Sequence, residues 1–112
     1  MNVLSASQKL PPIHPGEILL EEFMLPYGLS QSKLALELRI PLQRLHDVVK
    51  GKRGISLDTA VRLAYFFGTT PKMWINLQTR YELELAEDSG LFEHIAHDIH
   101  PLLQNPMEQQ SS

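Results

Sequence analysis

The sequence predicts an all-α fold of five helices, followed by a short helical extension at the C-terminus. Apolar residues recur at the helical spacing of about 3.6 residues in five successive segments. Serine, threonine or proline stands where most of these segments begin, and glycine or proline stands where most of them end. The chain shows no internal repeat and no alternating apolar pattern typical of a strand.

Composition narrows the class of protein. A length of 112 residues predicts a single domain, and a hydrophobic content of 43% is enough for a core. The absence of cysteine excludes a disulfide scaffold and a thiolate metal site. The first residues lack the pattern of a secretory signal, and no segment approaches the roughly 18 apolar residues that span a bilayer. We therefore expect a cytoplasmic protein that does not bind membranes.

The N-terminal region divides into an arm and a first helix. Residues 1–14 have no periodic pattern and contain "LPPIHP", which predicts a flexible N-terminal arm. Pro15 suits the first turn of a helix, and Glu17 favours the positive end of the helix dipole. Pro26 and Gly28 end this predicted helix.

The next two helices are short and nearly contiguous. Ser30 is a suitable N-cap for a second helix over residues 31–38. Ile40 and Pro41 then interrupt the pattern, because a residue before proline avoids the helical region while proline itself suits a first turn. The third helix should therefore run from about Pro41 to about Lys50.

The remaining helices follow from the same signals. Ser56 caps a fourth helix over residues 57–67, and Gly68 stops it. Thr70 and Pro71 begin the fifth helix in their preferred positions. The predicted divisions are a flexible arm of residues 1–14, a helical domain of residues 15–88, and a C-terminal extension and tail of residues 89–112.

The second and third helices, joined by a short turn, have the arrangement of a helix-turn-helix. In this motif the second helix enters the major groove of DNA and presents its early residues to base edges. Charged or polar side chains, with one leucine, occupy the positions that would face DNA. These candidate positions are Ser30, Gln31, Ser32, Lys33, Leu42, Gln43, Arg44, His46, Asp47, Lys50, Lys52 and Arg53.

The early residues of the third helix are the candidate base readers. Gln43 can pair with adenine, and Arg44 can reach guanine or a phosphate. Leu42 can pack on a thymine methyl group or belong to the protein core, and Gln43 and Arg44 are also compatible with an ordinary exposed surface. Lys52 and Arg53 lie in the following loop, where phosphate contact requires only reach and charge.

Charge is distributed unevenly along the chain, whose net charge is -3. Residues 32–62 contain seven bases and three acids, whereas residues 80–112 contain one base and seven acids. This asymmetry favours a central region that faces a polyanion and an acidic C-terminal region. Two solvated helix surfaces would show the same pattern.

Four motifs of the chain are similar to those of known families. "LSQSKLALEL" and "IPLQRLHDVVKGKRGIS" resemble the DNA-binding core of the Cro and phage-repressor class. "HPGEIL" and "FFGTTPKMWINLQ" more specifically resemble the HigA family of antitoxins, also called plasmid-maintenance antidote proteins. The resemblance covers about residues 13–86. Leu42 and Gln43 depart from the usual family residues, which puts the operator sequence in doubt but not the mode of binding.

The resemblance implies a five-helix repressor-like domain and a regulatory function. A HigA protein forms a homodimer, binds double-stranded operator DNA of its own toxin–antitoxin operon and represses it. It also neutralises a RelE-like mRNA-cleaving toxin by direct binding. The acidic C-terminal region would suit a basic toxin. The alternatives are a solitary repressor without a toxin and a protein-interaction module that does not bind DNA.

The fifth helix is a candidate dimer interface. Trp74, Leu77 and Tyr81 recur at near-helical spacing, and aromatic residues are enriched at interface cores. Trp74 is equally suited to fill the core of a single protomer.

The sequence predicts neither an enzyme nor a cofactor or metal site. His94, His97 and His100 are three residues apart, whereas the zinc-protease motif requires histidines four apart with a glutamate after the first. A surface helix with titrating histidines is the simpler interpretation, although a metal site from His94 and His97 stays open.

Overall fold

The computed structural model describes residues 10–103, and within them the chain forms helices and no strand, which confirms the all-α prediction. Residues 1–9 of the predicted arm and residues 104–112 of the predicted tail lie outside the described residues. The elements are α1 (Pro15–Ile18), the π-helix η2 (Leu19–Met24), α2 (Gln31–Leu38), α3 (Leu42–Val49), α4 (Leu57–Phe67), α5 (Pro71–Asp88) and α6 (Leu91–Asp98).

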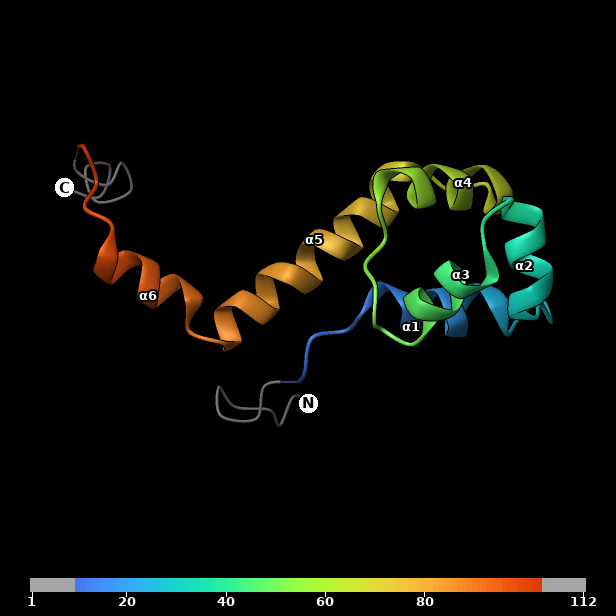
Figure 1. Cartoon of the computed structure of the whole chain (residues 1–112), viewed down its shortest axis with the longest axis horizontal. Coiled ribbons are helices and arrows are strands. Elements are labelled where there is room, and N and C mark those ends of the chain that lie inside the picture. The colour runs from blue at the N-terminus through green and yellow to red at the C-terminus, as the bar shows by residue number, and fades with distance from the viewer. Residues whose placement is uncertain (1–9, 104–112) are drawn as a thin grey trace, which may run out of the picture.

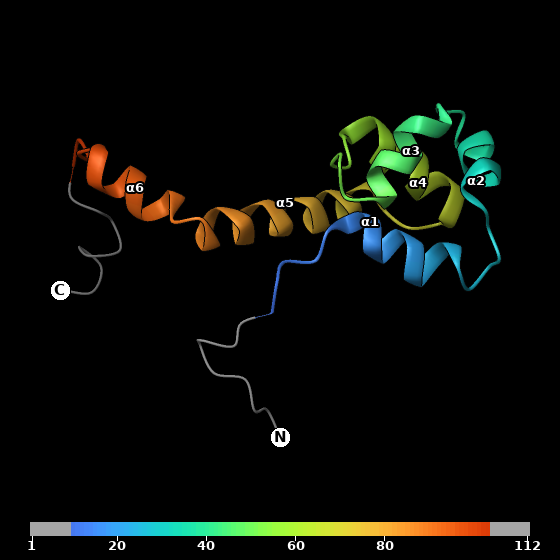
Figure 2. The ribbon, with the colours of Figure 1, turned by 60° about the horizontal axis from the view of Figure 1, so that its bottom comes forward.

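The first four α-helices and the beginning of α5 form a bundle at one end of the molecule (Figure 1). The rest of α5 runs away from this bundle and carries α6 at its far end, and a second view shows the same separation (Figure 2). None of the side chains of α6 is buried. Stability must therefore come mainly from the bundle, because only there do apolar side chains leave water.

The core of the bundle draws one or more large side chains from each of its helices. Leu19, Leu34, Leu45, Leu63 and Trp74 are each 0% exposed. They come from η2, α2, α3, α4 and α5 respectively. Burial of such side chains contributes about 1.5–3 kcal/mol each, so the five elements stabilise one another.

Trp74 lies inside the protomer. Its Nε1 donates to Thr69 Oγ1 at 2.8 Å, and its ring packs against Phe23 with 5.0 Å between ring centroids. Of the two interpretations of Trp74, a dimer interface or the core of a single protomer, the structure shows the core. A side chain with no exposed surface cannot contact a partner subunit unless the bundle opens.

Three caps predicted from the sequence are present. The Ser30 hydroxyl accepts from the Lys33 backbone N–H, and the Ser56 hydroxyl likewise caps α4. Thr70 accepts from the Met73 backbone N–H at 3.1 Å. Each cap satisfies a backbone donor that the helix leaves free.

The first predicted helix differs from expectation in its winding. It begins at Pro15 as predicted, but from Leu19 to Met24 it is a π-helix. In this segment the Leu25 N–H donates to the Leu20 carbonyl, five residues back. Wider winding brings residues five apart toward one face, so Leu19 and Met24 are both buried.

Within the described residues, no helix combines the length and apolar character needed to cross a bilayer.

Candidate nucleic-acid interface

Helix α3 divides sharply into a buried and an exposed face. Leu45 and Val48 are fully buried against the rest of the bundle, whereas Gln43 is exposed. Leu42 is 49% exposed, which places it at the surface and not in the core. The start of α3 therefore presents Leu42 and Gln43 to solvent, as a recognition helix requires.

The turn between α2 and α3 is built by three consecutive residues. Arg39 ends α2 in the left-handed conformation, with φ 59°. Ile40 then enters the core, and its N–H donates to the Ala35 carbonyl at 3.1 Å. Pro41 is extended and its carbonyl accepts from the Arg44 N–H, which begins α3.

Gln43 is held by its neighbour one turn later. Its Nε2 donates to Asp47 Oδ1 at 2.8 Å. This contact uses one amide hydrogen and leaves the other hydrogen and the carbonyl oxygen available. An adenine edge needs one donor and one acceptor, so the contact is compatible with bidentate recognition by Gln43.

Arg44 takes part in a network that joins α2, α3 and α4. Its Nη1 donates to Asp58 Oδ2 at 2.9 Å, and Arg62 Nε donates to the same oxygen at 2.9 Å. Arg62 also donates to the Leu38 carbonyl at the end of α2, at 2.9 Å. The Arg62 hydrogen bond, followed by that of Arg44, lowers the pKa of Asp58 below its ordinary value.

This network was not predicted from the sequence. Arg44 is predicted to contact guanine or a phosphate, and in the structure its guanidinium pairs with Asp58 of a different helix. The spacing of Asp58 and Arg62, four apart on one helix, signals their own pairing. Nothing in the local pattern indicates the third partner on α3.

The other predicted DNA-facing residues of α2 lie along its exposed start. His46 Nδ1 on α3 and Gln31 Oε1 on α2 are 3.2 Å apart and join the two helices of the motif. Lys33 forms an ion pair with Glu37 at 2.8 Å, and Ser32 is exposed. Exposed ion pairs of this kind are weak, so Lys33 remains free to exchange Glu37 for a phosphate.

The residues Lys50–Gly54, named here the basic loop, follow directly on α3. Lys50, Lys52 and Arg53 are exposed. The Asp47 carbonyl accepts from the backbone N–H groups of Lys52 at 2.8 Å and Arg53 at 3.2 Å. The loop is thus hydrogen-bonded to the end of the recognition helix, and its charges continue the exposed surface of α3.

Helix α5 fixes the far end of the basic loop. Gln78 Oε1 accepts from the Ile55 N–H at 2.8 Å, and Ile55 is buried. A Cβ atom added at Gly54 would lie 2.7 Å from Gln78 Nε2, so this position requires glycine or a displaced side chain. Sequence reasoning missed Gln78, because its partner lies 23 residues away.

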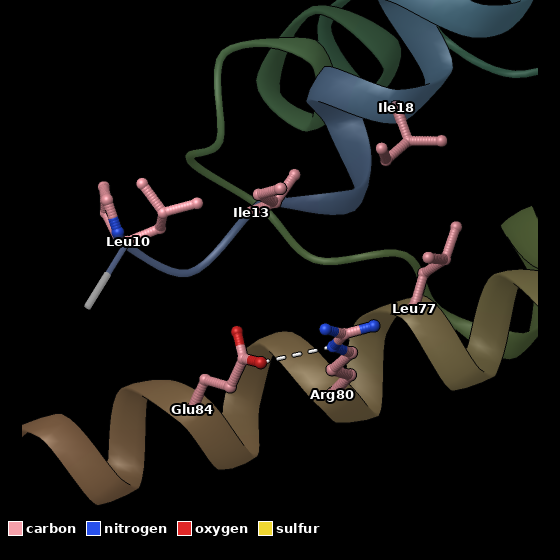
Figure 3. A pocket seen from close by; sticks show the side chains of 7 residues that line it. Leu10, Ile13, Ile18, Leu77, Arg80 and Glu84 are labelled. Atoms are coloured by element: carbon pink, nitrogen blue, oxygen red, sulfur yellow. Dashed lines mark hydrogen bonds and ion pairs between the residues drawn. The ribbon is translucent and has the colours of Figure 1, made fainter. Parts of the chain in front are cut away.

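The predicted DNA-facing residues lie on two consecutive helices, the cap before them and the loop after them. Leu77 and Tyr81, predicted for the dimer interface, are half-buried on α5. Leu77 lines a groove of about 400 Å³ between α5 and the chain that leads into α1 (Figure 3). Arg80 and Glu84 form an ion pair beside this groove.

The histidines of the C-terminal extension do not gather into a metal site. His94 and His97 lie on exposed α6, each 3.2 Å from Asp98. Residues 10–103 contain no group of three or more histidine, aspartate or glutamate side chains placed to hold a metal ion.

Comparison with known proteins identifies the family. A helix-turn-helix family model matches residues 20–74. Virulence-associated protein I of Dichelobacter nodosus is 44% identical over 87 residues, which cover 78% of this chain and 81% of the relative. The structure of Pseudomonas aeruginosa antitoxin HigA with the higBA promoter has a TM-score of 0.75 and 42% identity, covering 82% of this chain and 99% of that chain.

A second solved structure extends the agreement. An addiction module antidote protein of the HigA family from Coxiella burnetii has a TM-score of 0.74 and 43% identity, again covering 82% of this chain and 99% of that chain. None of these relatives is named as an enzyme. The exposed recognition helix, the matched motif and the similarity along nearly the full length of two HigA structures lead to one conclusion: the chain is a member of the HigA family of helix-turn-helix antidote proteins.

Proposed function

We propose that the protein is a DNA-binding antitoxin that represses its own operon as a dimer and neutralises a RelE-like toxin by direct binding. The exposed start of α3, continued by the basic loop, is the observation that carries the proposal. It combines a side chain able to read a base, Gln43, with charges able to hold the phosphate backbone. The Pseudomonas aeruginosa relative, whose structure includes promoter DNA, supports this assignment.

Dimerisation follows from the geometry of DNA reading. One recognition helix reads few base pairs, whereas two helices placed about 34 Å apart read both halves of a palindromic operator. Helix α5 is the proposed interface, through Leu77 and Tyr81, which retain some exposure.

A mobility shift with the protein's own promoter tests operator binding. If about six phosphates are contacted, affinity should fall by about 10³ or more as the salt concentration rises from about 50 to 200 mM. The absence of a specific band at low salt would sink the proposal, and the protein-interaction alternative would then be preferred. A RelE-like reading frame beside the gene would distinguish an antitoxin from a solitary repressor.

Gln43→Ala and Lys52→Ala separate base reading from phosphate contact. Gln43→Ala should remove about 1–3 kcal/mol of discrimination at one base pair. Lys52→Ala should weaken operator and random DNA to similar extents and reduce the salt slope by about 1. Titrating each variant with operator DNA and with random DNA measures these losses of affinity. Equal losses on both DNAs for Gln43→Ala would refute its role as a reader.

A further inference from the structure

His14 lies where three parts of the molecule meet. Its Nδ1 accepts from the Gly16 backbone N–H at 2.8 Å and caps α1. The ring lies near Gly51, where an added Cβ atom would be 3.8 Å from two of its carbon atoms, and the Arg53 backbone is close enough to raise the pKa of His14. The Tyr81 ring meets its edge, with 4.8 Å between centroids. One side chain thus connects α1, the basic loop and α5.

The start of α1 and the start of the basic loop both lie against one carbonyl group, that of Val48. The Val48 carbonyl accepts from the Gly51 N–H at 3.0 Å. A Cβ atom added at Gly16 would overlap that same carbonyl oxygen, so the backbone of α1 approaches it directly. Since His14 fixes the orientation of Gly16, it holds α1 against the end of α3 where the loop begins.

The loop backbone decides where two cationic side chains lie. Lys52 and Arg53 are exposed, and neither side chain forms an ion pair within the described residues. Within the described residues, the backbone bonds of Lys52 and Arg53 to the Asp47 carbonyl at the end of α3 are what position these two charges. Phosphate contacts depend on this placement, because each released counterion requires a charge near a phosphate.

We propose that His14 is a positioning residue that holds the basic loop against α1, so that Lys52 and Arg53 reach the DNA backbone. His14 itself does not contact DNA. The inference rests on the proposed function, and it gives the "HPG" segment a role in DNA binding besides helix initiation. Nδ1 must be unprotonated to accept from Gly16, so the neutral ring is the form that caps α1.

His14→Asn tests this role, because asparagine keeps an oxygen that can cap α1 but lacks a ring to meet Gly51 and Arg53. The variant should bind operator DNA about tenfold more weakly, with a salt slope reduced by about 1–2. In the free protein, the backbone amides of Lys52 and Arg53 should exchange hydrogen faster than in the wild type. Binding titrations across salt concentrations and amide exchange measured by NMR give the two readouts.

Thr70→Ala is the matched control. It also removes a helix cap, but that of α5, where Thr70 accepts from the Met73 N–H. It should lower the melting temperature and leave operator affinity, salt slope and loop exchange unchanged. The inference would be overturned if His14→Asn kept the wild-type salt dependence of operator binding and the wild-type hydrogen exchange of the Lys52 and Arg53 amides. A different outcome would separate the two proposals. If His14→Asn showed faster loop exchange but the wild-type protein did not bind the operator, the proposed function would be overturned. His14 would still be the residue that holds the loop.

Discussion

At the scale of single residues, Arg39 has a strained backbone conformation in the turn of the helix-turn-helix. Within residues 10–103 it is the only residue other than glycine with positive φ. A left-handed conformation costs an L-residue roughly 1–2 kcal/mol, because Cβ approaches the following carbonyl. The conformation is retained because Ile40 must enter the core directly afterwards.

Arg39→Gly should raise the free energy of unfolding by about 0.5–1 kcal/mol. Glycine adopts positive φ without the steric penalty, although its larger freedom in the unfolded chain offsets part of the gain. Denaturant titration measures the change, and Arg39→Ala is the control that keeps the strain. If Arg39→Gly and Arg39→Ala had equal free energies of unfolding, the left-handed backbone conformation would not be the cause of the gain.

The protonation of His14 should make stability depend on pH. Burial lowers the pKa of His14 below its ordinary value of 6.5, while the Arg53 backbone contact opposes this shift. The unfolded chain therefore binds a proton more readily than the folded protein does. His14 contributes its full stabilisation above about pH 6.5, and the contribution is lost as the pH falls toward the lower folded pKa.

Melting temperatures of the wild type and His14→Asn at pH 7.5 and 5 would measure this effect. The wild type should lose more stability than the variant between the two conditions. The other four histidines are common to both proteins, so the difference reports His14. A larger loss of stability in His14→Asn than in the wild type would show that the pKa of His14 shifts in the opposite direction.

At the scale of elements, the contact between α1 and α3 is made by backbone atoms. Gly16 is buried in the first turn of α1, and the Val48 carbonyl occupies the space where a side chain would begin. Because the clash would be with a backbone atom of α3, it cannot be relieved by a rotamer change. The "HPGE" segment thus specifies a docking contact as well as a helix start.

Gly16→Ala should destabilise the protein by about 1–3 kcal/mol or more, since the two helices must separate. Gly68→Ala is the comparison, because its φ of 75° is strained for alanine but no atom lies within 4 Å of the added Cβ. That variant should lose only about 1–2 kcal/mol, from strain alone. Urea unfolding of both variants measures the difference, and a milder loss for Gly16→Ala would contradict the steric explanation.

At the scale of the whole molecule, α6 stands apart from the bundle. Its apolar residues Leu91, Phe92 and Ile95 are 43–45% exposed, and none of its side chains is buried. From Tyr81 onward the sequence contains no lysine or arginine. An exposed apolar face among acidic side chains suits a basic protein partner, and in the proposed function that partner is the toxin.

Truncation after Gly90 should leave the bundle folded and weaken toxin neutralisation. The melting temperature should change little, because α6 buries no side chain. Neutralisation is measured by growth rescue or by mRNA cleavage with a fixed amount of toxin. Full-strength neutralisation by the truncated protein would refute a role for the extension.

The positions of most helices can be predicted from local signals in the sequence. Caps at Ser30, Ser56 and Thr70 and the break at Pro41 act within a few residues, so the pattern predicts the helix-turn-helix and its exposed residues. The π-helical winding after Ile18 was not predictable, since the same apolar spacing is compatible with an α-helix.

Only the tertiary structure decided which residues hold the site in place. Trp74 fills the core, Arg44 pairs with Asp58 on another helix, and the His14 ring lies beside Gly51 of the basic loop. These contacts join residues far apart in the chain, and they depend on how the helices pack. Local periodicity carries no information about packing partners, which is why the exposed start of α3 was predictable and the residues that contact it from other elements were not.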